Sequence, residues 1–304
     1  MTTRFRTDAT SNAACCLLAL ALLAAPQAFA GTPIKERAPA AADSRVEVSN
    51  TSGSVVVTAW PRNEVEVTGT LGDGSERLEF SSAGQTTRIK VVLPKVSSHV
   101  DSTDLVIKVP VGSSLAVNTV SADVRAQGVR GAQRLQSVSG DVQTEVAAED
   151  VECKTVSGNV TVTGNGQPAL LTITTVSGDA SVTRVAGEVN GNTVSGNFTI
   201  AMGDASRSRL RSTSGDLGLK GRLAPEARLD FESISGDVRL DLAAPVSAEF
   251  DVSSFSGDIR NCFGPKPVHT SEYAPGSEWR HREGQGTARV RIKTLNGDIQ
   301  VCNK

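Results

Sequence analysis

Acidic side chains recur at nearly constant spacing through the second half of the chain, and their type could support catalysis or ion binding. Arg239 and Arg260 lie two residues beyond two of them, Asp237 and Asp258. Carboxylates can act as general acids and bases, and enzymes built on β-helices commonly place them beside Arg or Lys. The first hypothesis is therefore a polysaccharide lyase or hydrolase. The row consists of Asp123, Asp141, Asn159, Asp179, Asn197, Asp216, Asp237, Asp258 and Asp298.

A bound cation is a second hypothesis for this row, as in an ion-binding envelope sensor, and a structural role is a third. Calcium takes about 6–8 oxygen ligands, and the sequence lacks the Gly-Gly-x-Gly-x-Asp repeat of calcium-binding β-helices. An Asp or Asn beside a glycine is typical of a turn whose amides the side chain caps. A catalytic site should also break the repeat locally instead of following it. The sequence favours turn capping, and we predict no catalytic residue, metal ligand or cofactor.

The repeat is broken between Gly257 and Gly297. Residues 263–287 contain several prolines and glycines without inward alternation, which predicts an excursion loop of about twenty extra residues. One interpretation is an interaction loop with the contact residues His269, Tyr273, Trp279 and His281. The favoured interpretation is a C-terminal cap that buries the tryptophan over the last coils. Two histidines without a Cys or acidic partner at ligand spacing are a weak metal signal.

A repeated six-residue motif predicts the elements that position these residues. Its six positions are Ser or Thr; an apolar residue; Ser; Gly; Asp or Asn; and another apolar residue. From position 122 the intervals between central residues are 18, 18, 20, 18, 19, 21, 21 and then 40. A period near twenty indicates stacked repeats. With the central residue numbered zero, apolar residues stand at −7, −5, −2, +2 and +4, which is typical of half-buried strands. We predict an all-β, single-stranded parallel β-solenoid with coils of about 18–21 residues, wound right-handed.

Two rows of mainly hydroxyl-bearing residues are expected on the outer surface, at −3 and −1. Such rows could order water, as in ice-binding solenoids, or contact a partner. Small β-favouring residues also suit a solvated sheet face, and the sequence favours this interpretation because the second row is Ser rather than Thr. The −3 row is Thr119, Ser137, Thr155, Thr175, Thr193, Ser212, Ser233, Ser254 and Thr294, and the −1 row is Ser121, Ser139, Ser157, Ser177, Ser195, Ser214, Ser235, Ser256 and Asn296.

Three cysteines test this architecture. Cys262 and Cys302 both occupy position +5 of their copies. If the segment between them is an excursion, the two copies are successive coils and the Cα atoms lie about 5 Å apart, within disulfide range. An extra coil between them would prevent the bond. Because an oxidising compartment favours disulfides, we predict a bond that fastens the C-terminal end. Cys153 stands at the inward position −5 and is expected to be a buried free thiol.

The N-terminal third repeats less faithfully. Residues 1–30 combine Arg4 and Arg6, an apolar run over 13–25 and a small-residue cleavage site, which predicts a secretory signal peptide cleaved near Gly31. Residues 31–42 are expected to be a flexible leader. Residues 43–112 are expected to form an irregular β N-terminal cap and first coil, which shield the strand edge. The regular solenoid then covers 113–304, and no segment after the signal is apolar enough to span a membrane.

Composition limits the classes of partner that the chain can be expected to bind. The 31 basic and 33 acidic residues are spread along the chain, which leaves no basic stripe for nucleic acid. Aromatic residues make up only 4%, and sugar-binding clefts commonly use aromatic rings as stacking platforms, so this scarcity counts against a carbohydrate enzyme. We predict a protein of the periplasm, cell surface or extracellular space. Its expected partner is an envelope or extracellular protein or glycan.

The junction between the cap and the coils resembles a known family. Residues 105–112 read LVIKVPVG and residues 115–124 read LAVNTVSADV, and the Ser-Gly-Asp copies extend the similarity over most of residues 45–302. In these residues the chain resembles the bacterial DUF4097 family, described as "putative adhesins", and relatives with DUF2807-type heads. The resemblance implies an exported β-solenoid for adhesion, scaffolding or surface interaction, with no catalytic residues. Ala122 replaces the expected glycine, so the first regular coil is expected to turn differently.

Overall fold

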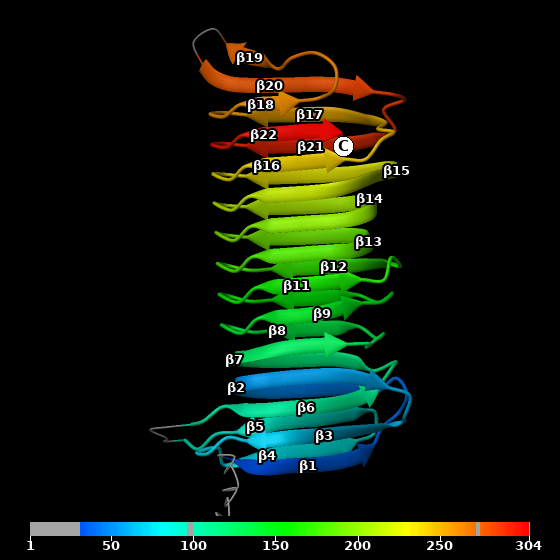
Figure 1. The fold of residues 1–304 in the computed structure, drawn as a ribbon, viewed down its shortest axis with the longest axis vertical. Helices are drawn as coiled ribbons and strands as arrows, with labels where there is room; N and C mark the ends of the chain where they lie inside the picture. Colours follow the sequence, from blue (N-terminus) through cyan, green and yellow to red (C-terminus); the bar gives the residue numbers. More distant parts are fainter. Residues whose placement is uncertain (1–30, 96–99, 272–273, 304) are drawn as a thin grey trace, which may run out of the picture. The chain divides into compact units, whose positions relative to one another are not determined.

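The computed structural model describes residues 31–95, 100–271 and 274–303, and in these segments the secondary structure consists of strands without helices. The strands hydrogen-bond into a continuous stack of coils (Figure 1). Among the described residues no helix is long and apolar enough to cross a membrane. The predicted all-β solenoid with parallel coils is therefore confirmed, while the hand of its winding stays a prediction.

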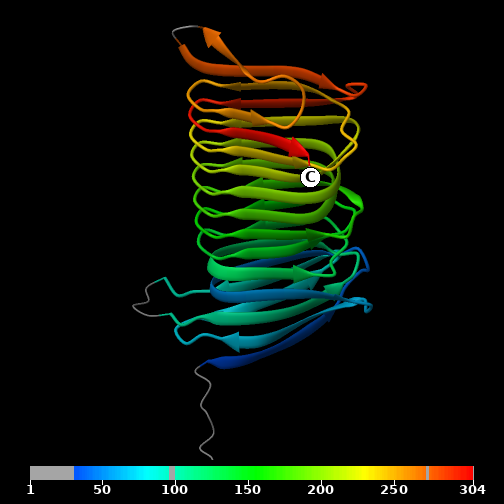
Figure 2. The same cartoon turned by 45° about the horizontal axis from the view of Figure 1, so that its top comes forward.

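Each regular coil consists of two strands joined by a sharp bend. We call the side of the stack that holds the strand before the bend the first face, and the side that holds the strand after it the second face (Figure 2). On the first face β8 (Gln133–Gln136) pairs in parallel with β10 (Val151–Lys154), and on the second face β9 (Val142–Val146) pairs in parallel with β11 (Val160–Gly164). The other regular strands are β7 (Ser114–Gln127), β12 (Pro168–Thr174), β13 (Ala180–Thr193), β14 (Phe198–Ser212), β15 (Leu217–Ser233) and β16 (Val238–Leu242).

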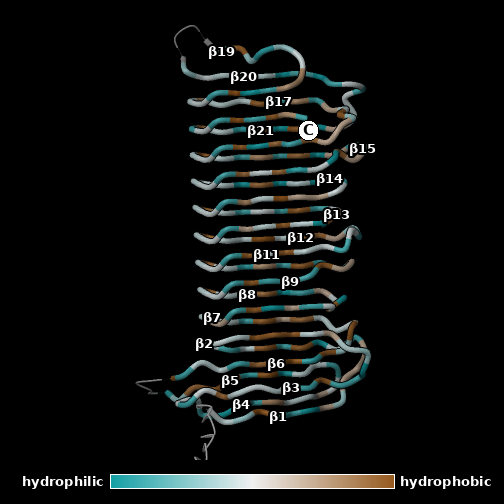
Figure 3. Tube along the Cα trace, in the orientation of Figure 1, coloured by the Kyte–Doolittle hydropathy of each residue, from teal (hydrophilic) through white to brown (hydrophobic). Residues whose placement is uncertain are grey.

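Side chains that point between the two faces form a continuous core. Around Gly236, the residues Leu229, Phe231, Val238 and Leu240 occupy the predicted inward positions and are at most 2% exposed. Full burial of one such side chain contributes about 1.5–3 kcal/mol. The alternation of apolar and polar residues is visible along the strands (Figure 3). The core therefore grows by one layer with each coil.

Cys153 occupies its predicted place in this core. It is a free cysteine with no exposed surface. Burial raises the pKa of its thiol to about 12, because the charged thiolate is poorly solvated there. The thiol therefore behaves as a small apolar side chain and is protected from reaction.

The residues next to each bend are placed differently from the prediction. The hydroxyl row at −3 points inward, with Thr175 only 1% exposed, whereas the apolar row at −2 points outward, with Val176 38% exposed. The bend comprises positions −2 to 0. The inward alternation of the strand, −7, −5 and −3, therefore ends just before the apolar residue at −2. The −2 side chain therefore lies on the outside of the bend, and the −1 row is exposed beside it.

The coil around Gly297 is not the last coil of the stack. Strand β21 (Ala288–Thr294) pairs in parallel with the end of β15 on one side and with β17 (Ala248–Ser254) on the other. Strand β22 (Ile299–Asn303) lies likewise between β16 and β18 (Ile259–Asn261). In Figure 1 the red strands accordingly lie between yellow and orange ones. The chain thus passes over one coil position, builds the coil around Gly257, and later returns to fill the gap.

Charges on the first face fit this inserted order. Strand β15 presents Asp230 and Glu232, β17 presents Asp251, and β21 presents Arg291 and Lys293. In the observed register Arg291 lies between the two aspartates. Direct stacking of β17 on β15 would place Asp230 opposite Asp251. Opposite charges on neighbouring strands stabilise a sheet and like charges destabilise it, so these charges favour the observed order. The ion pairs of the two aspartates are formed with other arginines, Arg209 for Asp230 at 3.7 Å and Arg280 for Asp251 at 3.2 Å.

Residues 263–271 and 274–287 contain two paired strands that cap the stack, where the sequence predicted an excursion loop. Strand β19 (Val268–Ser271) pairs antiparallel with β20 (Ala274–Glu283), and β20 pairs antiparallel with β17. Trp279 is only 2% exposed, and its ring centroid lies 5.0 Å from that of Phe250 and 5.9 Å from that of His281. The tryptophan covers the last apolar layer, so the segment is the C-terminal cap that the sequence favoured.

Cys262 and Cys302 form the predicted disulfide, with their Cα atoms 4.8 Å apart. Their coils are adjacent because the preceding residues, Asn261 and Val301, are paired in register. The coil of Cys302 nevertheless lies on the inner side of the coil of Cys262, since the C-terminal strands fill the gap below it. The bond therefore joins the inserted coil to the end coil.

The predicted flexible leader is a strand. Strand β1 (Thr32–Pro39) pairs antiparallel along its whole length with β3 (Glu64–Leu71), because Ile34 packs into the core at 9% exposure while Arg37 binds Glu66 on the outer side. Strand β3 pairs antiparallel with β6 (Thr103–Pro110). The N-terminal cap predicted over 43–112 therefore begins earlier, at residue 32.

An inserted coil is also present at the N-terminal end. Strand β2 (Arg45–Trp60) pairs in parallel with β7 on one side and with β5 (Thr86–Val92) and β6 on the other. Strand β4 (Arg77–Ala83) closes the first face antiparallel to β5. The first coil of the sequence consequently lies inside the stack, and strands that follow it in sequence form the end.

Candidate functional site

The bends are closed by hydrogen bonds within each coil. The N–H of Gly178 donates to Thr175 Oγ1 at 3.0 Å, and the hydroxyl at −3 accepts the corresponding bond in five other bends. All nine −3 residues are buried and in six bends the hydroxyl caps the glycine N–H, so they do not form an outer row that could order water or contact a partner. The other five donors are the N–H groups of Gly140, Gly158, Gly196, Gly215 and Gly236.

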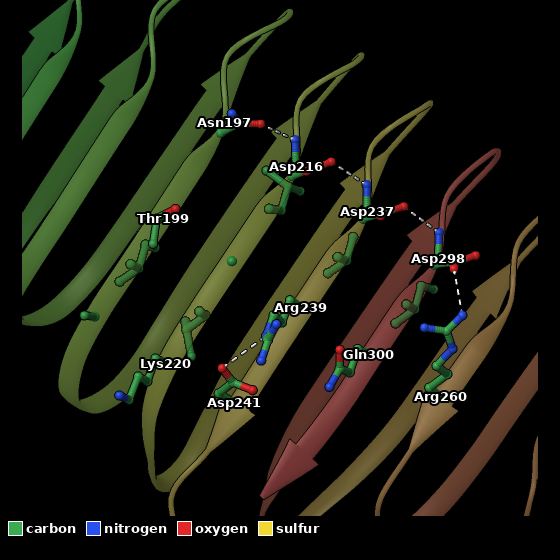
Figure 4. Close-up of a pocket in the computed structure, with 17 residues that line it drawn as sticks. Asn197, Thr199, Asp216, Lys220, Asp237, Arg239, Asp241, Arg260, Asp298 and Gln300 are labelled. Carbon is green, nitrogen blue, oxygen red and sulfur yellow. Dashed lines mark hydrogen bonds and ion pairs between the residues drawn. The ribbon is translucent and has the colours of Figure 1, made fainter. Parts of the chain in front are cut away.

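The acidic row forms a second set of hydrogen bonds, which run between coils. Asp216 Oδ1 accepts the N–H of Asp237 at 2.9 Å, and Asp237 Oδ1 accepts the N–H of Asp298 at 2.8 Å (Figure 4). The same bond links all nine coils from Asp123 to Asp258, with distances of 2.7–3.1 Å. Each acceptor side chain thus satisfies an amide of the neighbouring bend, a role that Asp and Asn fill equally.

Close approach of neighbouring bends explains the central glycine. A Cβ at Gly178 would lie 1.9 Å from the carbonyl oxygen of Gly158. Neither glycine has a positive φ, so the requirement is steric and not conformational. At Ala122 the chain continues as strand β7 without a sharp bend, which agrees with the expectation that this coil turns differently.

A hollow of about 610 Å³ lies on the second face toward the C-terminal end (Figure 4). Its floor includes Gly218 of β15, which stands between Thr199 and Arg239 on the neighbouring strands. A Cβ at Gly218 would meet nothing nearer than 3.9 Å, so the fold does not require glycine there. This is position +3, and the prediction missed it, although a comparison of the copies shows that each of the others carries a side chain at +3. Those residues are Arg125, Gln143, Thr161, Ser181, Thr199, Arg239, Arg260 and Gln300.

The arginines of the hollow pair differently from the sequence hypothesis. Arg239 Nε lies 3.2 Å from Asp241 Oδ2, and Arg260 Nη2 lies 3.4 Å from Asp298 Oδ2. Neither arginine pairs with the acidic residue two positions before it in sequence. The proximity in sequence therefore does not translate into the carboxylate–arginine sites that a lyase or hydrolase hypothesis needs.

The remaining groups of the hollow add polar side chains to a wall that also includes apolar residues such as Leu217 and Ile299. Lys220, Thr199 and Gln300 line it together with the ion pairs, so hydrogen-bond donors and acceptors alternate around the bare backbone at Gly218. General acid–base catalysis needs a positioned group within about 2.6–3.2 Å of the reacting proton. The carboxylates here are instead bonded to backbone amides and arginines. The arrangement suits reversible binding of a polar ligand.

The predicted interaction residues do not converge on one site. Trp279 is buried in the C-terminal cap, and His281 stacks on it while its Nε2 lies 2.9 Å from Glu283 Oε2. His269 is exposed on β19, and Tyr273 lies outside the described residues. Of the described residues, Trp279 and His281 thus cover the end of the core, whereas His269 does not.

A second charged cluster lies at the N-terminal end. Arg62, Lys108 and Arg37 lie 5.0, 5.3 and 5.9 Å from the ring centroid of Trp60. Glu66 accepts hydrogen bonds from Lys108 and Arg37, and these bonds lower the pKa of Glu66 to about 2. Glu66 of β3 thereby joins Arg37 of β1 to Lys108 of β6, and these contacts stabilise the N-terminal cap.

Comparison with known families gives a match over almost the whole described stack. A family model described as Toastrack DUF4097 matches residues 41–302. No protein among those with curated functions matches the chain. The family match agrees with the resemblance seen in the sequence and with the β-solenoid described above.

Solved structures share the fold at low sequence identity. A Parabacteroides distasonis protein named "Putative lipid binding protein" has a TM-score of 0.51 and 13% identity, with 89% of this chain and 97% of that chain covered. A "putative adhesin" from the same species has a TM-score of 0.46 and 13% identity, with coverages of 89% and 98%. A "putative adhesin" from Bacteroides fragilis has a TM-score of 0.44 and 9% identity, with coverages of 90% and 97%. At these identities the first similarity supports the fold alone.

Proposed function

We propose that this chain, which belongs to the Toastrack DUF4097 family, is an exported surface-interaction module of the cell envelope, an adhesin or scaffold that binds its partner without turnover. The observation that carries this proposal is the bonding of the acidic row. Its side chains accept backbone N–H groups of the next coil, so the residues best suited to catalysis are engaged in holding the coils together. What remains on the second face is an open polar surface with a hollow.

The hollow around Gly218 is the place where this module would hold a ligand. Its floor is exposed backbone, and its rim carries Lys220, Arg239 and Gln300 as donors beside acidic acceptors. This mixture fits a ligand that is itself rich in hydroxyl and charged groups, such as a glycan. Without an aromatic platform each contact is weak, so a repeating polymer that engages several molecules at once is the favoured ligand class.

A turnover assay tests the absence of catalysis. The protein from residue 31 onward is incubated with envelope and extracellular polysaccharides, and new reducing ends and unsaturated products are measured. We expect none. Asp237→Asn and Asp258→Asn serve as comparison variants that leave the fold intact, because Asn already fills this role at positions 159 and 197. Turnover by the unaltered protein that either substitution abolishes would overturn the proposal.

Filling the hollow tests the ligand site. Gly218→Val adds a side chain where the fold leaves room and is expected to weaken glycan binding at least about tenfold, which corresponds to about 1.4 kcal/mol. Ser181→Val is the matched control, because Ser181 is the exposed +3 residue of another coil outside the hollow. Both changes favour strand structure, so lost binding cannot be ascribed to unfolding. Equal binding by both variants would exclude the hollow.

Export rests on the signal-like first thirty residues and on the disulfide, which is typical of oxidising compartments. Sequencing of the N-terminus of the protein isolated from its native host tests this directly. We expect the chain to begin at or near Gly31 and to be found outside the cytoplasm. An intact N-terminus in a cytoplasmic fraction would contradict export, and fractionation of the envelope would distinguish the periplasm from the cell surface.

A further inference from the structure

An apolar row follows the outer edge of the stack from the coil of Ala122 to the C-terminal end coil. It consists of the residues at −2, and eight of its nine side chains are apolar and 38–56% exposed. Their neighbouring bends are hydrogen-bonded; for example, the N–H of Ser195 donates to the carbonyl oxygen of Val176. We call this row the bend ridge. In spatial order it is Val120, Val138, Val156, Val176, Val194, Thr213, Ile234, Leu295 and Phe255.

The fold does not require apolar residues on the bend ridge. At Thr213 the bend keeps its bonds, since the N–H of Gly215 donates to Ser212 at 2.7 Å and the N–H of Ser235 donates to the Thr213 carbonyl at 2.8 Å. A polar residue therefore fits the same place. The eight apolar residues are each 38–56% exposed and lie along neighbouring bends, so together they form one long apolar patch, the kind of patch that marks an interaction site on a monomer. Such a patch indicates an interaction surface.

The two flanks of the bend ridge carry different charges. On the side of the second face runs the acidic row, with seven Asp among nine positions. On the side of the first face runs the −4 row, which has three cations, Lys154, Arg211 and Lys293, and one anion, Glu232. The ridge therefore separates an acidic flank from a weakly basic one.

We propose that the bend ridge is a self-association surface on which a second copy of this chain docks in parallel. A two-fold axis along the stack brings ridge against ridge and places the acidic flank of each copy against the basic flank of the other. Lys293 then faces Asp298 of the second copy, and Arg211 faces Asp216. A two-fold axis across the stack would align the two acidic flanks, and their like charges would repel. Charge thus selects the parallel arrangement.

The size of the surface agrees with this partner. A standard specific interface buries about 800 Å² per partner, and the ridge runs over nine coils with the exposed −1 row beside it. A two-fold interface is self-complementary, so the same patch serves both copies. The apolar residues would form its centre and the charged flanks its rim, as in other protein interfaces.

Sedimentation of the chain from residue 31 onward tests the proposal. We expect a dimer, and we expect Val156→Glu to raise its dissociation constant at least about a hundredfold, because the two-fold axis sets the two new carboxylates opposite each other. Val106→Glu is the matched control: Val106 is 41% exposed, close to the 43% of Val156, but lies on the second face away from the bends. A monomeric unaltered protein, or a dimer that tolerates Val156→Glu, would overturn the proposal.

Cross-linking tests the parallel arrangement. Val138→Cys, Val194→Cys and Leu295→Cys are made one at a time and oxidised, and each is expected to give a covalent dimer because equivalent coils face each other. In an antiparallel dimer only Val194→Cys, in the middle of the ridge, would cross-link. That result would overturn the parallel arrangement.

Binding to vesicles distinguishes a membrane from a second copy. Neutral and anionic phospholipid vesicles are mixed with the unaltered protein and with Val156→Glu. We expect no binding by either, because the acidic flank runs the full length of the ridge. Vesicle binding that Val156→Glu abolishes, by a protein that sediments as a monomer, would assign the bend ridge to a lipid surface and overturn the dimer. The hollow shares Asp216, Asp237 and Asp298 with the acidic flank. Its floor at Gly218 lies on β15 beyond the bend, so Gly218→Val is expected to leave the dimer unchanged.

Discussion

The regular coils and the C-terminal end are built from the same repeat, but they follow different rules of order. In the regular part each copy lies on the copy that precedes it, as β8, β10 and β12 do. At the C-terminal end the strands β21 and β22 lie between earlier copies. The bend bonds cannot distinguish the two orders, because each copy offers its neighbour the same glycine and the same Asp or Asn. Side chains particular to each coil therefore decide which neighbour it takes.

The regular part should depend most strongly on its central glycines. Gly178→Ala places a Cβ 1.9 Å from a backbone oxygen, and neither coil can move without disturbing the next. We expect a loss of about 4 kcal/mol, at the upper end for single substitutions, measured by denaturant unfolding. Gly203→Ala is the control, because a Cβ there meets nothing within 4 Å and the φ of Gly203 is not positive. Equal stability of both variants would show that the bends are looser than described.

The C-terminal end should depend on its disulfide. Cys262→Ser combined with Cys302→Ser opens a closed loop spanning a sequence separation of 40 residues, for which we expect a loss of up to about 4 kcal/mol in the free energy of unfolding. Hydrogen exchange should become faster in β17, β18, β21 and β22, while β9 and β11 serve as the internal reference. Uniform acceleration along the stack would mean that the two regions unfold as one.

The order of the last coils should respond to a change of charge. Arg291→Glu aligns three carboxylates along neighbouring strands, and we expect a loss of about 1 kcal/mol that shrinks at high salt. A second substitution, Asp251→Lys, should restore only part of it, because the new lysine lies beside the glutamate at 291 but also beside Arg280, which pairs with Asp251 at 3.2 Å. Arg125→Glu on the second face of a regular coil is the control for a change of charge elsewhere. If Arg291→Glu has no effect at low salt, another contact fixes the order.

The N-terminal end should be the part most sensitive to acid. The change in the free energy of unfolding expected here is the smallest of these predictions. The folded-state pKa of Glu66 is about 2 against an ordinary value of 4.5, so its contribution to stability is complete above pH 4.5 and is lost as the pH falls toward about 2. Glu66→Gln should flatten the pH dependence of unfolding in this window, measured by fluorescence of Trp60. An unchanged slope would show that another carboxylate governs the acid response.

Much of the stack could be predicted from the sequence because one coil implies the next. The period, the inward positions −7, −5, +2 and +4, and the disulfide all follow from the copies. The placement of −3 and −2 was wrong because both sides of the glycine were treated as symmetric. Thr175 continues the two-residue alternation of the inward residues before it and lies inside. Val176 already belongs to the bend and lies outside.

The coil order and the hollow could not be predicted from the average copy, because both arise from deviations within single copies. The positive charge of Arg291 differs from the negative charges at the equivalent positions Asp230 and Asp251. The repeat does not say which strands are neighbours, so this difference alone could not predict the coil order. Gly218 differs from its equivalents only by a missing side chain. The strand β1 was missed because an edge strand that pairs on one side needs only Ile34 to anchor it in the core.

The inserted position of β21 and β22 also bears on when the protein can finish folding. A chain that emerges from a membrane pore with its N-terminal part first can stack its regular coils as they appear. The coil around Gly257 cannot take its final neighbour until residues 288–303 have followed, since those residues fill the space beneath it. In the export proposed above, completion of the C-terminal end would wait until these strands have been transported, and that end would be the last part of the molecule to become resistant to proteases.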